Sequence, residues 1–100
     1  MKFAAIIEYA ADPAKIAEVR PSHRQYLTKL KEAGQLAICG PFTDDSGALI
    51  VYETDSLEDA ESIVKNDPFC QNGVFVSWVI RPWKTVMGNV EVLTRNLMVP

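Results

Sequence analysis

The sequence has a single histidine, only two cysteines and no long uncharged apolar run. Zinc sites need clustered Cys and His ligands, and neither Cys39 nor Cys70 belongs to a C-x-x-C pair, so no metal site is expected. The two thiols are expected to be reduced and mostly buried, because free cysteine behaves as a small hydrophobic residue. A membrane-spanning helix needs about 18 uncharged residues, and the N-terminal apolar run meets Glu8 too early for a signal peptide. We therefore expect a cytoplasmic protein with no membrane partner.

Positive charge is also scarce. The ten Lys and Arg residues are scattered along the chain, and 13 Asp and Glu residues give a net charge of −3. Nucleic-acid surfaces need clustered Lys and Arg, so no nucleic-acid partner is expected. The sequence has no Gly-rich phosphate loop, nucleophile elbow or acidic pair at metal spacing, which argues against nucleotide, flavin and metal cofactors. A chain of 100 residues is long enough for one domain with one core.

The apolar runs predict four strands, because each is short and bounded by turn-forming residues. The second and third are expected to form a hairpin. The four strands are expected over residues 2–9, 35–42, 48–53 and 74–80.

Two helical regions are expected between these strands. Asp12 and Pro13 are typical of a helix start, and a helix should follow to Val19. Pro21 should interrupt it, so that a new helix runs from Pro21 to Ala33. Later, Ser56 should cap a further helix that ends at Asp67-Pro68. Residues 69–73 should then form a short connection.

The order strand, helix, strand, strand, helix, strand is typical of the α+β ferredoxin-like split βαβ fold, an antiparallel sheet with helices on one face. The outer strands are nearly continuous in apolar residues, so the open face of the sheet should also be hydrophobic. A bare apolar face predicts a partner, and two copies packed sheet against sheet would form a homodimer. The tail over residues 85–100 should add a strand or arm on the same domain or on the partner subunit. Its apolar residues are Val86, Met87, Val90, Val92, Leu93, Leu97 and Met98.

His23 is the first candidate for catalysis, because imidazole is the side chain that titrates nearest neutral pH. At a predicted helix start its pKa would be lowered, whereas a carboxylate such as Asp67 would raise it and fix the tautomer. Arg20, one helical turn earlier, is suited to a carboxylate or phenolate on a ligand. Each residue also has a structural interpretation. His23 could be a half-exposed helix residue, Asp67 a turn former, and Arg20 a surface arginine paired with Glu18 or Asp12.

Three further residues are candidates for lining a substrate pocket. Gly40 and Ser46 lie at the ends of the predicted hairpin, and Phe69 follows Asp67-Pro68. Glycine at a hairpin end and an aromatic residue in a core need no functional reason, so both interpretations stay open.

Several short motifs, in order and with consistent spacing, resemble the YCII-related family over residues 1–84. They are Arg20-Pro21-x-His23, Gly34-x-Leu36, Cys39-Gly40-Pro41, Gly47-Ala48-Leu49-Ile50-Val51, Asp67-Pro68-Phe69 and Gly73-Val74. The resemblance implies a dimeric α/β barrel with an active-site pair that falls on His23 and Asp67, and a family arginine that falls on Arg20. One characterised type in the family removes chloride from a chlorinated hydroxyquinol. This chain differs from the common pattern in its short hairpin turn and its longer tail.

These inferences together predict a small enzyme without a cofactor, a lyase or isomerase that acts on a compact polar or aromatic acid. His23 would move a proton, Asp67 would orient and charge-balance the ring, and Arg20 would bind an anionic substituent. The alternatives are a muconolactone-isomerase-like activity and a non-catalytic module for small-molecule binding or assembly. A ring nitrogen of His23 within hydrogen-bond reach of Asp67 would favour catalysis, whereas side chains on opposite surfaces would favour the non-catalytic module.

Overall fold

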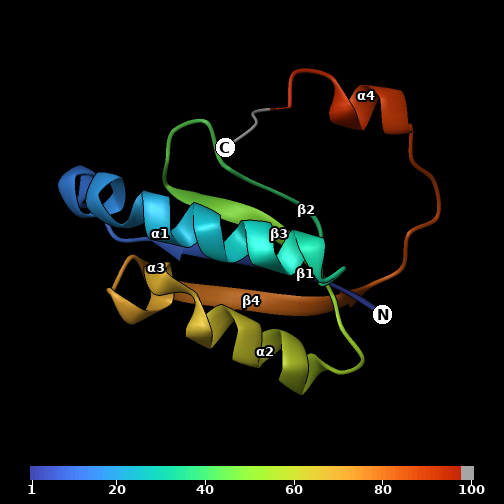
Figure 1. Cartoon of the computed structure of the whole chain (residues 1–100), viewed down its shortest axis with the longest axis horizontal. Coiled ribbons are helices and arrows are strands. Elements are labelled where there is room, and N and C mark those ends of the chain that lie inside the picture. The colour runs from blue at the N-terminus through green and yellow to red at the C-terminus, as the bar shows by residue number, and fades with distance from the viewer. Residues whose placement is uncertain (98–100) are drawn as a thin grey trace.

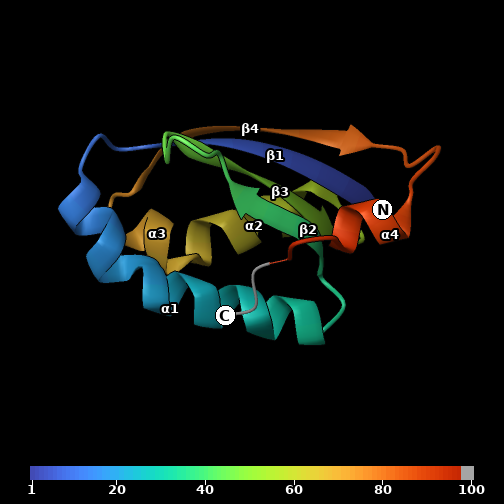
Figure 2. The same ribbon diagram turned by 90° about the horizontal axis from the view of Figure 1, so that it is seen from above.

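A four-stranded antiparallel sheet forms the centre of the molecule. Its strands lie in the order β2 (Leu36–Pro41), β3 (Gly47–Glu53), β1 (Lys2–Tyr9) and β4 (Phe75–Trp83). The computed structural model describes residues 1–97. Helices α1 (Pro13–Glu32), α2 (Leu57–Asn66) and α3 (Pro68–Gln71) lie on one side of the sheet, as Figures 1 and 2 show. The predicted α+β ferredoxin-like architecture is therefore confirmed. The elements are β1 (Lys2–Tyr9), α1 (Pro13–Glu32), β2 (Leu36–Pro41), β3 (Gly47–Glu53), α2 (Leu57–Asn66), α3 (Pro68–Gln71), β4 (Phe75–Trp83) and α4 (Val90–Thr94).

The core lies between the sheet and the helices, and the central strand β1 divides its side chains between the two faces of the sheet. Its odd-numbered residues are buried, because successive side chains of a strand point to opposite faces. The residues of β3 that pair with them lie on the same face of the sheet. The core residues that the two strands contribute on the helix side are Phe3, Ala5, Ile7, Tyr9, Ala48, Ile50 and Tyr52.

The open face has an apolar centre. Ile6 on β1 is paired with Leu49 on β3 and with Val79 on β4, so the three side chains form a row across the sheet. All three are exposed, Ile6 by 50% and Val79 by 59%. Charged residues mark one end of this face, where Lys2 contacts Glu53 at 2.9 Å.

Helix α1 is continuous through Pro21, so the predicted interruption at this residue is wrong. A proline inside a helix removes one hydrogen bond and costs about 3 kcal/mol. Here Pro21 and Ala17, whose carbonyl loses its donor, are both exposed, so water can reach that carbonyl. The buried stripe keeps its helical spacing across the proline, and its packing on the sheet offsets the cost. The stripe consists of Ile16, Val19, His23 and Leu30.

The segment after α2 also differs from the prediction. Ser56 caps α2 as expected, accepting a hydrogen bond from the Asp59 amide at 3.1 Å. However, residues 69–73 were predicted to form a connection, and part of this segment belongs to a short helix, α3, which begins directly after Asp67. Pro68 restricts Asp67 to extended backbone, which ends α2 and starts α3 with a change of direction.

Strand β4 extends to Trp83 and includes Pro82, which was expected to end it. Because β4 lies at the edge of the sheet and pairs only with β1, a residue without an amide hydrogen is tolerated there. The strand is therefore longer than its apolar run.

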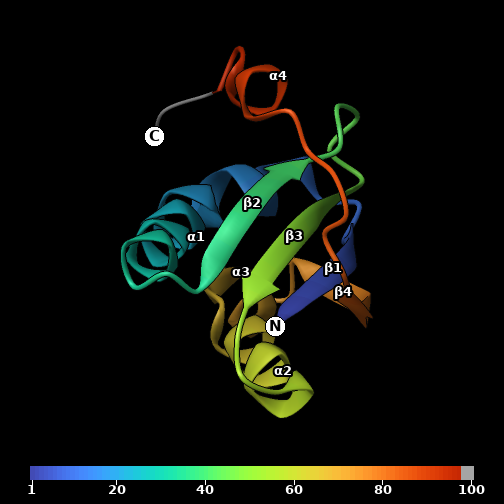
Figure 3. The same cartoon turned by 90° about the vertical axis from the view of Figure 1, so that its right-hand side faces the viewer.

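Beyond β4, the tail stands away from the domain, and Figures 1 and 3 show α4 separated from the sheet. All described residues from Arg81 to Leu97 are exposed. The described part of the tail beyond β4 contains the short helix α4. The tail was predicted to add a strand or an arm, and its described residues form no strand beyond β4. Met98, which was also assigned to the apolar tail, lies outside the described residues.

Candidate active site

His23 lies in the middle of α1 and contacts Asp67, which comes from the junction of α2 and α3. The distances from its Nδ1 to Oδ1 and Oδ2 of Asp67 are 2.7 and 2.9 Å. The imidazole is only 6% exposed, so it is not the half-exposed residue of the structural interpretation. It lies far from the start of α1, so the predicted position of His23 in the first turn of a helix is wrong.

Asp67 combines the two roles that the sequence left open. Its Oδ1 accepts a hydrogen bond from the Phe69 amide at 2.8 Å and so caps α3, which is the turn-forming role. The same carboxylate also contacts His23, and the residue is fully buried. The backbone break at Pro68 thus fixes the carboxylate at Nδ1 of the imidazole ring.

Aromatic rings enclose the imidazole. Phe69 is stacked on it, with ring centroids 3.9 Å apart and an angle of 13° between the planes. Phe75 approaches it edge-on at 5.9 Å, and Tyr9 packs against both phenylalanines at 5.3 and 6.0 Å. Sequence reasoning did not single out Tyr9 or Phe75 as site residues. The available signal for Tyr9 was the alternation along β1, which puts odd-numbered residues on the helix side.

The contact with Asp67 determines which ring nitrogen can act. An ionised carboxylate can only accept hydrogen bonds, so Nδ1 carries the proton and Nε2 has the lone pair when the ring is neutral. Within residues 1–97, Asp67 is the hydrogen-bond partner of the ring. Nε2 is therefore the nitrogen that could take a proton from a ligand, with Asp67 stabilising the resulting imidazolium.

Arg20 lies one turn before His23, but its ion-pair partner is neither Glu18 nor Asp12. Its Nη2 donates to Oδ1 of Asp45, in the turn between β2 and β3, at 2.6 Å. Sequence reasoning missed Asp45, because a residue in a turn of several acidic and polar residues carries no sign of a partner 25 positions away.

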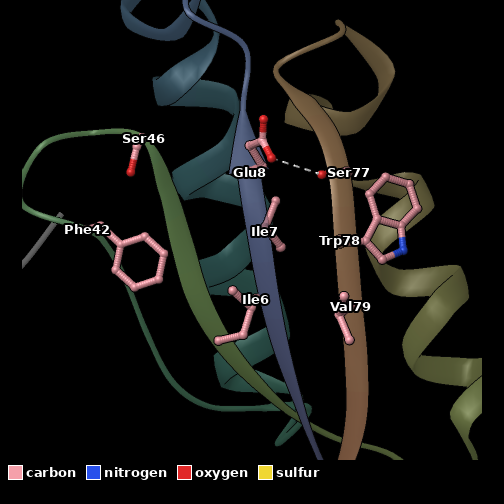
Figure 4. Close-up of a pocket in the computed structure, with 8 residues that line it drawn as sticks. All are labelled: Ile6, Ile7, Glu8, Phe42, Ser46, Ser77, Trp78 and Val79. Atoms are coloured by element: carbon pink, nitrogen blue, oxygen red, sulfur yellow. Dashed lines mark hydrogen bonds between the residues drawn. The ribbon is translucent and has the colours of Figure 1, made fainter.

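Gly40 and Ser46 lie apart from the histidine. Gly40 pairs with Leu49 and so belongs to the apolar row of the open face. Ser46 lines an open groove of about 550 Å³ on the same face (Figure 4). The groove is lined by Ile6, Ile7, Glu8, Phe42, Ser46, Ser77, Trp78 and Val79. The structure therefore brings three predicted site residues together, His23, Asp67 and Phe69, and leaves these two on the other side of the sheet.

The tyrosines of the core have unusually high pKa values. Burial raises the pKa of Tyr9 to about 12 and that of Tyr26 to about 12, and it also raises the pKa of Tyr52. For Tyr9, the positive charge of Arg20 acts against burial, whereas Asp45 and Asp67 add to it. The phenol of Tyr9 thus lies within electrostatic reach of both ion pairs.

These values predict a loss of stability in alkali. The chain has three tyrosines, and in the unfolded state each loses its proton near pH 10. The folded state keeps these protons to about pH 12, so the free energy of unfolding should fall as the pH rises from about 10 to 12. In a spectrophotometric titration, tyrosinate absorbance should rise together with the loss of circular dichroism. Tyrosinate formation near pH 10 in a protein that keeps its dichroism would contradict this prediction.

The two cysteines are free and half-buried. Burial raises the pKa of the Cys39 thiol, and the nearby Asp67 carboxylate adds to the effect. In the described part of the chain, no group of three His, Cys, Asp or Glu residues is placed to hold a metal ion, and no helix is long and apolar enough to cross a membrane.

An antiparallel β2-β3-β1-β4 sheet with helices on one face defines an α+β domain like those of dimeric α/β barrel proteins, and the buried contact between His23 and Asp67 lies on the helix side of this sheet. The chain belongs to the YCII-related family. The YCII-related domain matches residues 1–84, so the resemblance read from the sequence motifs is confirmed.

Two relatives support this assignment. Protein YciI of Escherichia coli O6:H1 is 33% identical over 92 residues, which cover 78% of this chain and 94% of that protein. The uncharacterized protein YjpA of Bacillus subtilis is 37% identical over 62 residues, which cover 62% of this chain and 72% of that protein.

Two solved structures share the fold. The 5-chloro-2-hydroxyhydroquinone dehydrochlorinase TftG of Burkholderia phenoliruptrix, solved in complex with 2,5-dihydroxybenzoquinone, has a TM-score of 0.71 and 27% identity. It matches 84% of this chain and 94% of its own. Muconolactone isomerase has a TM-score of 0.66 and 13% identity, over 90% of this chain and 95% of its own. The structural neighbours of this chain thus include enzymes of small molecules.

Proposed function

We propose that this protein is a small enzyme that transfers a proton on a compact anionic or aromatic substrate, using its own side chains. The observation that carries the proposal is the buried contact of 2.7 Å between His23 and Asp67, beneath the stacked ring of Phe69. A histidine that served only to fill the core would not need a fully buried carboxylate, because burying such a group is costly unless it is paired. The pair is therefore best explained as a general base with its orienting partner.

In the proposed reaction, Nε2 of His23 removes a proton from a hydroxyl group or an activated carbon of the substrate. The electron pair released in this way forms a new double bond. In an elimination it expels an anionic leaving group, and in an isomerisation the proton returns to another atom. Asp67 stabilises the imidazolium, and Arg20 binds an anionic substituent of the substrate.

The substrate class is proposed from the character of the site and from TftG. Aromatic residues surround the imidazole, and flat rings pack well against such side chains. TftG, at 27% identity, was solved with 2,5-dihydroxybenzoquinone, so hydroxylated quinones and related ring acids are the first compounds to test. The likeness to muconolactone isomerase, at 13% identity, concerns the fold alone and does not choose between elimination and isomerisation.

A screen of hydroxylated quinones, halogenated hydroxyquinols, aromatic acids and unsaturated lactones tests the function. Turnover of one of them, followed by absorbance and product analysis, is expected for the wild type and is expected to be lost when His23 is replaced. Binding without turnover, or turnover that survives the replacement of His23, would favour the non-catalytic module.

We further propose that two copies of the chain pack through the open faces of their sheets. Ile6, Leu49 and Val79 form a contiguous exposed row on this face. Such a row is unfavourable in water, and a second copy offers the same apolar surface in return. The exposed tail after Lys84 is proposed to lie as an arm on the partner subunit, because it begins at the edge strand that borders this face.

Light scattering after size-exclusion chromatography tests the dimer. The 11.1 kDa chain is expected to run as a dimer of twice that mass, and Ile6→Glu, which puts a charge in the centre of the row, as a monomer. Leu57→Glu, at an exposed position of α2 on the helix side, is the matched control and should stay dimeric. Deletion of residues 85–100 should weaken the dimer. A wild type that is monomeric at micromolar concentration would contradict the proposal.

A further inference from the structure

The ion pair between Arg20 and Asp45 places one of the protein's own carboxylates on an arginine that lies one helical turn before His23 on α1. The two residues are 25 positions apart, and the distance between Nη2 and Oδ1 is 2.6 Å. Residues three apart on a helix have neighbouring side chains, about 5–6 Å apart at Cβ, so Arg20 and His23 belong to one region of the surface. The guanidinium is thus placed to bind an anion beside the imidazole, but Asp45 already occupies it.

The backbone of the turn presents Asp45 in an uncommon conformation. Its φ of 60° is in the left-handed region, which costs non-glycine residues about 1–2 kcal/mol. Its neighbour Asp44 faces inward to the turn, where it accepts hydrogen bonds from the amide and hydroxyl of Ser46 at 3.0 and 2.7 Å. Of the two adjacent carboxylates, Asp44 therefore stabilises the turn and Asp45 reaches across to α1.

The bond to Asp45 is one that a ligand could replace. It uses a single Nη2 donor, whereas arginine offers five donors and binds carboxylates best through two parallel bonds. The side chains of Arg20 and Asp45 are 27% and 41% exposed, and solvent-accessible ion pairs contribute only about 0–1 kcal/mol. A carboxylate that binds in the bidentate manner would therefore displace Asp45 at low cost.

The turn that carries Asp45 also borders the groove on the open face. Phe42 and Ser46, on either side of Asp45 in the chain, line this groove (Figure 4). At its other side the turn is attached to β1 by a hydrogen bond from the Tyr9 amide to the Ser46 carbonyl at 2.8 Å. Asp45 thus lies in a turn that contacts both the groove and, through Tyr9, the aromatic residues around His23.

We propose that Asp45 occupies the anion-binding position of the substrate on Arg20, and that a carboxylate-bearing ligand binds by displacing it. This inference rests on the proposed function of Arg20 as the residue that binds the anionic substituent. Asp45 then acts as a specificity-determining residue. It excludes weakly binding anions and admits ligands whose carboxylate forms the better, bidentate contact.

The test uses benzoate as the anionic probe and benzamide as its neutral counterpart, with binding followed through NMR shifts of the Tyr9 and Ser46 amides. Asp45→Asn is expected to bind benzoate about 2- to 5-fold more tightly than the wild type, because it removes a competitor worth up to about 1 kcal/mol. Asparagine tolerates the left-handed conformation, so the turn should persist. Benzamide should bind both proteins equally.

Two further variants isolate the cause. Asp44→Asn removes the same charge from the neighbouring position, which does not contact Arg20, and should bind benzoate as the wild type does. Adding Arg20→Gln to Asp45→Asn should abolish the gain. Equal or weaker benzoate binding by Asp45→Asn, or a gain that survives the loss of Arg20, would overturn the proposal. Because the probe undergoes no reaction, this result is independent of whether His23 is catalytic.

Discussion

A His23→Asn variant is expected to lose about 10²- to 10⁴-fold in kcat, the contribution of a positioned general acid or base. The amide nitrogen of asparagine lies near the position of Nδ1, so it can still donate to Asp67 and satisfy the buried carboxylate. The variant has no counterpart of Nε2. It therefore removes the proposed proton acceptor while keeping the contact that supports the fold. The measurement is steady-state kinetics on a substrate found in the screen, together with circular dichroism.

Gln25→Asn is the matched control for this variant. Gln25 lies on the exposed surface of α1, so the substitution brings the same helix-disfavouring asparagine to the same element without touching the pair. It should keep wild-type turnover. If His23→Asn also turned over substrate at the wild-type rate, His23 would have a purely structural role, and the proposed reaction would be wrong.

Replacing Asp67 by alanine is expected to lower the free energy of unfolding by about 2–4 kcal/mol. The change leaves the buried Nδ1–H of His23 without an acceptor, which costs about 1–3 kcal/mol. It also removes the cap of α3 from the Phe69 amide, which adds about 1 kcal/mol. Urea unfolding followed by circular dichroism measures the loss, which is a large part of the total stability of a domain of this size.

Two variants separate the components of this loss. Asp12→Ala removes an exposed helix cap, the contact with the Lys15 amide at 3.1 Å, and should cost about 1 kcal/mol. Its difference from Asp67→Ala measures the buried contact with His23. Asp67→Asn should be more stable than Asp67→Ala, because its amide can still contact both partners, yet it should be poorly active, since an amide that donates to Nδ1 reverses the tautomer. Equal stability of Asp67→Ala and Asp12→Ala would show that the buried contact contributes nothing.

Much of the fold follows from local patterns in the sequence. The strands were predictable because alternating apolar residues and turn-forming residues act over a few positions, and the cap at Ser56 is likewise local. The continuity of α1 was not predictable, because the local cost of Pro21 is offset by packing against a sheet that forms from distant segments. Strand β4 passes Pro82 for a similar reason, since only the assembled sheet decides which strand is at the edge.

The candidate site was likewise predictable only in part from local patterns in the sequence. The family resemblance pointed to His23 and Asp67 as a pair, but each residue also had an adequate local explanation, and local patterns do not relate residues that are 44 positions apart. Asp45 and Phe75 had no local signal of a role, and the alternation along β1 placed Tyr9 only on the helix side of the sheet. Their proximity to the pair arises when β1, the hairpin turn and β4 are brought beside α1.

The sequence by itself determined the class of the domain, its element order, its family and the chemical types available at the site. These properties depend on residue identity and on periodicity over a few positions, and both can be read from the sequence. The tertiary structure alone decided that the imidazole is buried against the carboxylate, that Asp45 pairs with the arginine, and which face of the sheet stays open. Those outcomes depend on distances between segments far apart in the chain, and such distances exist only after the sheet and helices have packed together.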